Sequence, residues 1–131
     1  MPVSAPRSEP LDARNRSAPL PSRNDYVRIV LDLFLAVPDT PSRARPFDRR
    51  QALAFYRHRV PLPDIAHALR LVVLRRHSRP SRFQPLEPIH SLAYIRPLLR
   101  RFQRDPPRIS EVDRIEWRYW ELMAERAQNR G

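Results

Sequence analysis

The sequence predicts an all-α protein, a single small domain of about five helices with a disordered, basic N-terminal arm. Three observations favour this fold class. A chain of 131 residues is long enough for one domain of ordinary size. Its 16 prolines disfavour a large regular sheet, because each proline removes a hydrogen-bond donor from a strand. Apolar residues recur at three- and four-residue spacing in five segments, which is the period of one helix face.

Residues 1–24 form the predicted arm, and residues 25–128 the predicted helical domain. The arm is rich in proline, serine, alanine and arginine and has few bulky apolar residues. It therefore cannot bury enough surface to offset the entropy lost on ordering. The start of the chain lacks the apolar core of a signal peptide, and no apolar run approaches the length of a membrane span. We expect a cytoplasmic protein that does not interact with membranes.

The first helix is predicted over residues 25–37, with Asn24 or Asp25 as its N-cap. It is apolar nearly all the way round, which is typical of a helix central in the core or of one half of a dimer interface. The second helix is predicted over residues 48–59. Because the third helix follows at once, we expect these two to form a tight helical hairpin.

The third helix, residues 63–77, has the clearest start and stop signals in the chain. Prolines fit its entrance, since a first-turn proline gives up an N–H that has no helical partner there. Asp64 suits the positive end of the helix dipole, and the basic residues 75–77 suit the negative end. The apolar residues of its inner face are Ile65, Ala68, Leu69, Val72 and Val73.

The fourth helix is predicted over residues 90–104 and the fifth over residues 110–127. Pro97 lies inside the fourth pattern, so it should kink that helix or mark a late start. Ser110 begins a short capping-box match before an apolar run. Residues 110–131 hold four arginines and five acidic residues. The fifth helix therefore looks more like a packing or partner-binding helix than one that contacts DNA.

The charge balance is strongly basic, at +11, and every one of the 25 basic residues is arginine. The planar, bidentate guanidinium suits phosphate groups and guanine edges, so the excess favours nucleic acid as a partner. A GC-rich genome would also replace lysine with arginine. That bias does not explain why basic residues outnumber acidic ones so heavily.

Two groups of arginines are the candidate nucleic-acid-binding residues. If the third and fourth helices pack side by side, both groups could face one phosphate backbone. Such contacts make binding salt-dependent and tolerant of sequence. A plain solvated basic surface is the alternative. The first group is Arg75, Arg76, Arg79 and Arg82, and the second is Arg96, Arg100, Arg101 and Arg104.

Motifs for catalysis are absent from the sequence. It contains no P-loop, no dinucleotide-binding glycine pattern, no zinc-protease motif and no nucleophile elbow. The single glycine is the last residue, and without cysteine there is no disulfide or thiolate metal site. The four histidines are not spaced as a metal set. We therefore expect a protein that is not an enzyme, with no catalytic residue, no cofactor and no metal.

Residues 47–102 carry a family resemblance. An aromatic helix around Phe55 and Tyr56 is followed by V-P-L-P-D-I-A-H-A-L from Val60 to Leu69, and later by Y-I-R-P-L-L-R-R-F from Tyr94 to Phe102. This order resembles the C-terminal domain of the DnaD/DnaB-type replication initiation proteins, which are helicase-loading partners in Gram-positive bacteria and their phages. The resemblance implies DNA binding through the basic end of the domain and a role in replication or on a mobile element.

The leading hypothesis is a non-enzymatic DNA-binding accessory protein. One alternative is a helical protein–protein interaction module, which would dimerise through the 25–37 helix or bind a larger protein through the 110–127 helix. Another is an RNA-binding protein, because a basic surface does not distinguish the two polymers. Salt dependence separates phosphate binding from an apolar interface.

Overall fold

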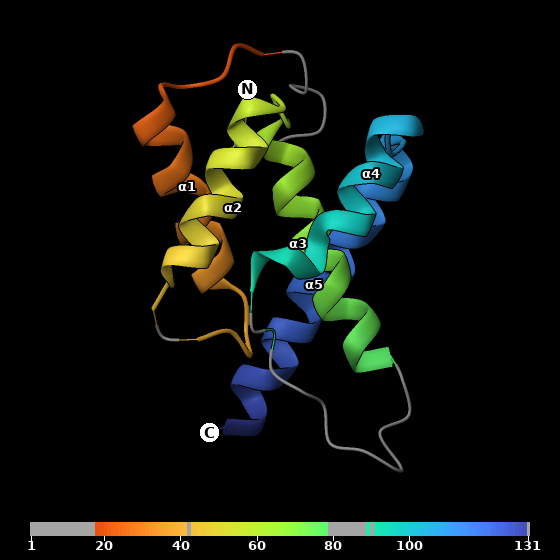
Figure 1. Ribbon diagram of the computed structural model, residues 1–131. Coiled ribbons are helices and arrows are strands. Elements are labelled where there is room, and N and C mark those ends of the chain that lie inside the picture. The colour runs from red at the N-terminus through yellow and green to blue at the C-terminus, as the bar shows by residue number, and fades with distance from the viewer. Residues whose placement is uncertain (1–17, 42, 79–88, 90, 131) are drawn as a thin grey trace, which may run out of the picture.

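The structure, a computed structural model, describes residues 18–41, 43–78, 89 and 91–130. These residues form helices and no strands, which confirms the all-α fold class (Figure 1). Residues 1–17 of the predicted disordered arm lie outside the described residues. The helices are α1 (Arg23–Ala36), α2 (Pro46–Arg57), α3 (Leu62–Ser78), the 3-10 helix η3 (Leu92–Ile95), α4 (Arg96–Arg104) and α5 (Ile109–Arg130).

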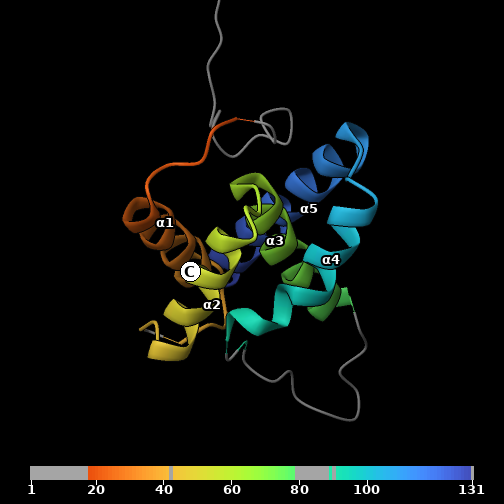
Figure 2. The ribbon, with the colours of Figure 1, turned by 45° about the horizontal axis from the view of Figure 1, so that its top comes forward.

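Helix α3 is the centre of the fold. It packs against α1, η3, α4 and α5, and two views show α1 and α2 on one side of it and the first half of α5 on the other (Figures 1 and 2). Four residues of its predicted inner face, Ile65, Ala68, Leu69 and Val73, are at most 1% exposed, while Val72 is only partly buried. Burying these side chains supplies much of the hydrophobic stabilisation of the domain.

Helix α1 begins two residues before the predicted start. Ser22 is its N-cap, because its hydroxyl accepts from the Asp25 backbone N–H at 3.3 Å; Asn24 and Asp25 lie within the first turn. The predicted arm therefore ends too late, at 24. On the inner side of α1, Tyr26, Val30 and Phe34 are fully buried. This confirms a place in the core for that side, while the leucines of the outer side stay partly exposed.

Helix α2 begins at Pro46 because the proline occupies its first turn, where the missing N–H costs nothing. The predicted start at 48 was two residues late. Asp48 is fully buried and accepts two backbone hydrogen bonds, from Arg45 N at 3.0 Å and from Leu92 N at 3.1 Å. It therefore caps α2 and joins it to η3. A short turn joins α2 to α3 as expected, but the two helices do not form a tight hairpin, since α2 packs mainly on α1 and η3.

Helix α2 ends at Arg57, two residues before the predicted end, because Arg59 adopts a left-handed conformation with φ of 55°. The Arg59 N–H donates to the Tyr56 carbonyl at 2.9 Å, and the Val60 N–H donates to the Phe55 carbonyl at 3.0 Å. This pair of bonds is the Schellman motif that satisfies the last carbonyls of a helix. The turn reverses the chain into α3.

The fourth predicted helix is divided. Residues 92–95 form η3, and α4 begins at Arg96 with Pro97 in its first turn, so Pro97 marks a late start. Helix α5 extends from 109 to 130 and so exceeds the predicted 110–127 at both ends. Near the C-terminal end of α5, Arg126 contacts Asp39 at 3.5 Å and His77 at 2.8 Å, which ties this part of the helix to the rest of the fold. None of the described helices combines the length and apolar character needed to cross a membrane.

Candidate nucleic-acid interface and aromatic surface

Three arginines form a line along α4. Arg96, Arg100 and Arg104 are all exposed and lie four residues apart, so they share one side of the helix. At 1.5 Å of rise per residue, successive members are about 6 Å apart along the axis. We call these three residues the α4 stripe. Over residues 91–108 the sequence holds five arginines and a single acidic residue, Asp105, so the stripe lies in a strongly basic segment.

Arg101, the fourth predicted residue of this group, is engaged within the fold. Its Nη2 atom lies 2.7 Å from Oε2 of Glu111, and both side chains are partly buried. The pair joins α4 to the start of α5. Arg108 is exposed just beyond α4, and its four-residue spacing from Arg104 in the sequence continues the pattern of this group.

The first predicted group is only partly described. Arg75 is exposed in the last turns of α3, and Arg76 beside it is half-buried. Arg79 and Arg82 lie outside the described residues. Only Arg75 of this group is therefore described as an exposed cation.

Helices α3 and α4 contact each other, as the candidate interface requires. The two helices cross, and their C-terminal ends lie apart in both views (Figures 1 and 2). The last turn of α3, with Arg75 and Arg76, therefore lies toward one end of the pair, and the last turn of α4, with Arg104, toward the other. The α4 stripe is thus the part of the predicted site that the described residues bring together.

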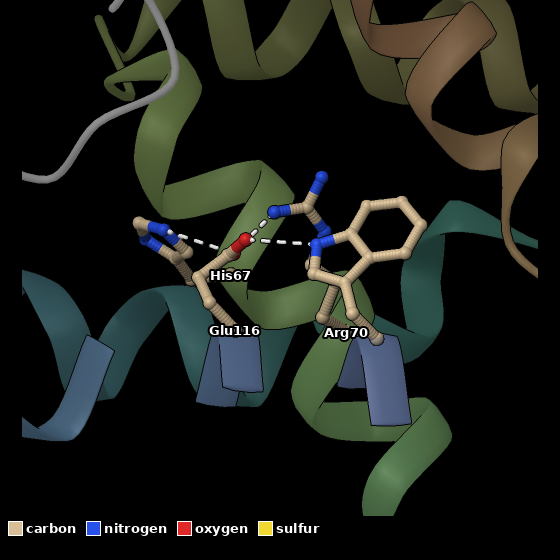
Figure 3. Close-up of polar contacts among 4 residues, drawn as sticks. His67, Arg70 and Glu116 are labelled. Carbon is tan, nitrogen blue, oxygen red and sulfur yellow. Dashed lines mark hydrogen bonds and ion pairs between the residues drawn. The ribbon is translucent and has the colours of Figure 1, made fainter. Parts of the chain in front are cut away.

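A polar junction joins α3 to α5. His67 and Arg70, one turn apart on α3, both point toward Glu116 of α5 (Figure 3). Oε2 of Glu116 lies 3.5 Å from Nε2 of His67 and also accepts from Nη1 of Arg70. No local motif in the sequence marks this cluster, because Glu116 lies at least 46 residues from the two α3 residues.

The junction also holds Trp120. Its indole Nε1 donates to Oε1 of Glu116 at 3.3 Å, and the Arg70 guanidinium lies 5.4 Å from the centres of both the Trp120 and Tyr119 rings. The Tyr119 and Trp120 rings meet edge to face at 5.0 Å. Burial raises the pKa of Tyr119, with Arg70 opposing and Glu116 reinforcing that shift. Trp120 is therefore held in one orientation although it is 55% exposed.

Trp117, one turn before Trp120, is 72% exposed. The two indoles line a shallow hollow of about 540 Å³ on α5, together with three acidic residues. We call this surface the Trp face; its residues are Asp113, Glu116, Trp117, Trp120 and Glu121. Neither tryptophan falls on the apolar stripe that Val112, Ile115 and Tyr119 form at three- and four-residue spacing, and this spacing is the signal in the sequence for their exposure.

The chemistry of the junction is that of a structural contact. His67 is 1% exposed, so a substrate could not reach its ring. Within the described ranges, no three histidine, aspartate or glutamate side chains are grouped as metal ligands. The Arg70–Glu116 pair lies between two helices, where it holds one against the other.

Comparison of the chain with models of known protein families, with curated proteins and with solved structures gave no match. The resemblance of residues 47–102 to the DnaD/DnaB-type domain therefore stays a prediction. Any functional assignment rests on the residues themselves.

Proposed function

We propose that this protein is a non-enzymatic DNA-binding accessory protein that contacts the phosphate backbone through the α4 stripe. The observation that carries the proposal is the exposure of three arginines at four-residue spacing in a segment with one acidic residue. Guanidinium groups bind phosphate oxygens through paired hydrogen bonds. Contacts of this kind position a protein on a nucleic acid without reading its sequence.

The proposed setting is replication or the maintenance of a mobile element in the cytoplasm. The resemblance of residues 47–102 to the DnaD/DnaB-type domain supports it, because that resemblance implies DNA binding through the basic end of the domain. RNA is the alternative polymer, since phosphate contacts alone do not distinguish it from DNA.

The test is a fluorescence-anisotropy titration with labelled single-stranded DNA, duplex DNA and RNA of matched sequence, at several salt concentrations. The variant combines Arg96→Gln, Arg100→Gln and Arg104→Gln, which retain helix propensity and remove three charges. Loss of three phosphate contacts should reduce the slope of log K against log salt by about 2.7 for duplex and about 2.1 for single strands.

The matched control removes three exposed charges elsewhere, through Arg43→Gln, Arg114→Gln and Arg118→Gln. It should retain most of the wild-type salt slope. A wild-type protein that binds no polymer at low salt would overturn the proposal, and so would an α4 variant that binds as the control does. Tighter binding to RNA than to either form of DNA would favour the alternative polymer.

The Trp face favours a second candidate function, a helical protein–protein interaction module. Tryptophan is enriched at the energetic centres of protein interfaces. Trp117 and Trp120 are exposed beside acidic residues, which would repel the phosphates of a nucleic acid. The α5 helix is thus suited to a protein partner, while the α4 stripe is suited to nucleic acid.

A further inference from the structure

A second surface of the molecule complements the Trp face. Helices α1 and α2 and the segment between them line a groove of about 770 Å³, which we call the α1–α2 groove. Its apolar lining includes Leu31 and Leu35 of α1 and Leu53 of α2, all partly exposed. These leucines belong to the outer side of α1 and the adjoining side of α2, which the core leaves uncovered.

The rim of the groove is basic. Arg23, Arg28, Arg49 and Arg57 line it and are exposed, against one exposed acidic residue, Asp32. Arg28 lies 3.4 Å from Asp25, whereas no ion pair joins the other three rim arginines to a carboxylate in the part of the chain described. The sequence does not mark this set, because its members come from two helices that only the fold brings together.

The occupant of the groove can be deduced from its chemistry. Apolar walls with a basic rim fit an apolar group that carries acidic neighbours. The Trp face has this composition, with two indoles beside Asp113 and Glu121. Nucleic acid fits less well, because none of the described residues that line the groove is an aromatic side chain on which a base could stack.

We propose that the Trp face of one copy docks into the α1–α2 groove of a second copy. This inference rests on the second candidate function and names its partner. The two surfaces cannot meet within one molecule, because α1 and α2 lie on one side of α3 and the first half of α5 lies on the other (Figures 1 and 2). Pairing of two Trp faces is disfavoured, since it would bring like carboxylates together.

The geometry of Trp120 suits this role. Its bond to Glu116 and the Arg70 guanidinium near its ring hold the exposed indole in place before any partner arrives. A side chain that is already ordered loses little conformational entropy on binding. Arginine and tryptophan, the main side chains of the two surfaces, are also the residue types enriched at interface hot spots.

Two different patches on one chain form a head-to-tail contact, which leaves a free patch at each end. Association should therefore continue beyond a dimer as concentration rises. Each patch is small, so we expect weak association, detectable at high protein concentration.

The experiment is analytical ultracentrifugation of the full chain over a wide concentration range. The face variant combines Asp113→Asn, Trp117→Ala and Glu121→Gln, and it spares Trp120 so that the junction stays intact. The groove variant combines Arg49→Glu and Arg57→Glu. Circular dichroism would check that each variant is folded. The control combines Arg114→Gln and Arg118→Gln, which lie on the same helix as the Trp face.

We expect growing oligomers for the wild type and the control, and monomers for each variant alone. An equal mixture of the two variants should form a dimer and stop there, because only one intact face and one intact groove remain. A monomeric mixture, or a wild type that stays monomeric, would overturn the inference. A wild type that associates only when nucleic acid is added would overturn it as well.

The failure of this inference is distinguishable from the failure of the proposed functions. All of these variants keep the α4 stripe, so single-copy DNA binding can be measured by anisotropy in the same samples. A monomeric wild type rejects self-docking and leaves the nucleic-acid proposal to its own titration. It also leaves the Trp face open to a different protein partner.

Discussion

Asp48 shows how one side chain can serve both local and tertiary structure. It is fully buried and accepts from the backbone N–H groups of Arg45 and Leu92. Asp48→Ala would leave the buried N–H of Leu92 and the partly buried N–H of Arg45 unpaired, and we expect it to lower the free energy of unfolding by about 2–3 kcal/mol. Urea denaturation measures this loss.

Asp32→Ala, at an exposed position of α1, is the control and should change the stability by less than about 0.5 kcal/mol. Asp48→Asn should be intermediate, because its single carbonyl oxygen can still accept. Equal stability of the Ala variants at the two positions would contradict the role assigned to Asp48.

Tyr26 makes the stability of the fold depend on alkaline pH. Its hydroxyl donates to the Val60 carbonyl at 2.7 Å, and burial, reinforced by the charge of Asp64, raises its pKa far above the usual value. The folded state thus holds the phenolic proton more tightly than the unfolded chain. The resulting stabilisation is complete below about pH 10, where an unfolded tyrosine stays protonated, and is lost as the pH rises further.

We therefore expect the urea midpoint of the wild type to fall above about pH 10. Tyr26→Phe should be less stable at neutral pH, since the Val60 carbonyl loses its donor, and should show a shallower alkaline fall. Some fall should remain, because burial raises the pKa of Tyr119 too. Tyr94→Phe, at a position 42% exposed, should follow the wild type. An unchanged pH dependence in Tyr26→Phe would refute the assignment.

At the scale of elements, the turn between α2 and α3 carries backbone strain. Arg59 has a positive φ, a conformation that costs a residue with a Cβ atom about 1–2 kcal/mol relative to glycine. Arg59→Gly should relieve that strain. Because glycine also adds freedom to the unfolded chain, we expect a net gain of about 0.5–1 kcal/mol in thermal or urea unfolding.

Arg57→Gly is the comparison: it also replaces an arginine by glycine, but two residues earlier, at the last helical position of α2. It should destabilise the protein, because glycine disfavours a helical conformation. A loss of stability in both variants would mean that the Arg59 side chain contributes more than its backbone strain costs.

The positions of the five helices followed from local patterns, and their boundaries did not. Apolar spacing and proline placed the centre of every helix, because both act within a few residues. Pro97 marks the late start of α4 that the sequence allowed. The other ends shifted where a local competitor prevailed: the Ser22 hydroxyl at α1, and Pro46 and the left-handed Arg59 at α2. At each of these helix ends, neighbouring residues could serve as the cap, and the free energies of the alternatives differ little.

At the scale of the whole molecule, the His67–Arg70–Glu116 junction holds α5 against α3. Glu116→Ala would leave the partly buried Arg70 without this carboxylate and Trp120 without its acceptor. We expect the free energy of unfolding to fall by about 2–3 kcal/mol, since removing one partner of a partly buried ion pair leaves the other charge uncompensated. Chemical denaturation followed by tryptophan fluorescence measures both the loss and the altered surroundings of Trp120.

Glu125→Ala, at an exposed position on the same helix, is the control and should remain near the wild type. If the Glu116→Ala variant were as stable as this control, α5 would be held by its apolar contacts and its other polar contacts without help from Glu116. The ion pair would then be incidental to the fold.

The sequence by itself determined the helical class, the apolar inner face of α3 and the basic character of residues 91–108, because these depend on composition and on spacing within one segment. Only the tertiary structure decided which charged groups remain free. Arg70 and Arg101 are paired with glutamates of α5, whereas Arg96, Arg100 and Arg104 stay exposed. The α1–α2 groove likewise exists only in the fold. The physical reason is that pairing and burial depend on distances between residues far apart in the chain, which no local pattern contains.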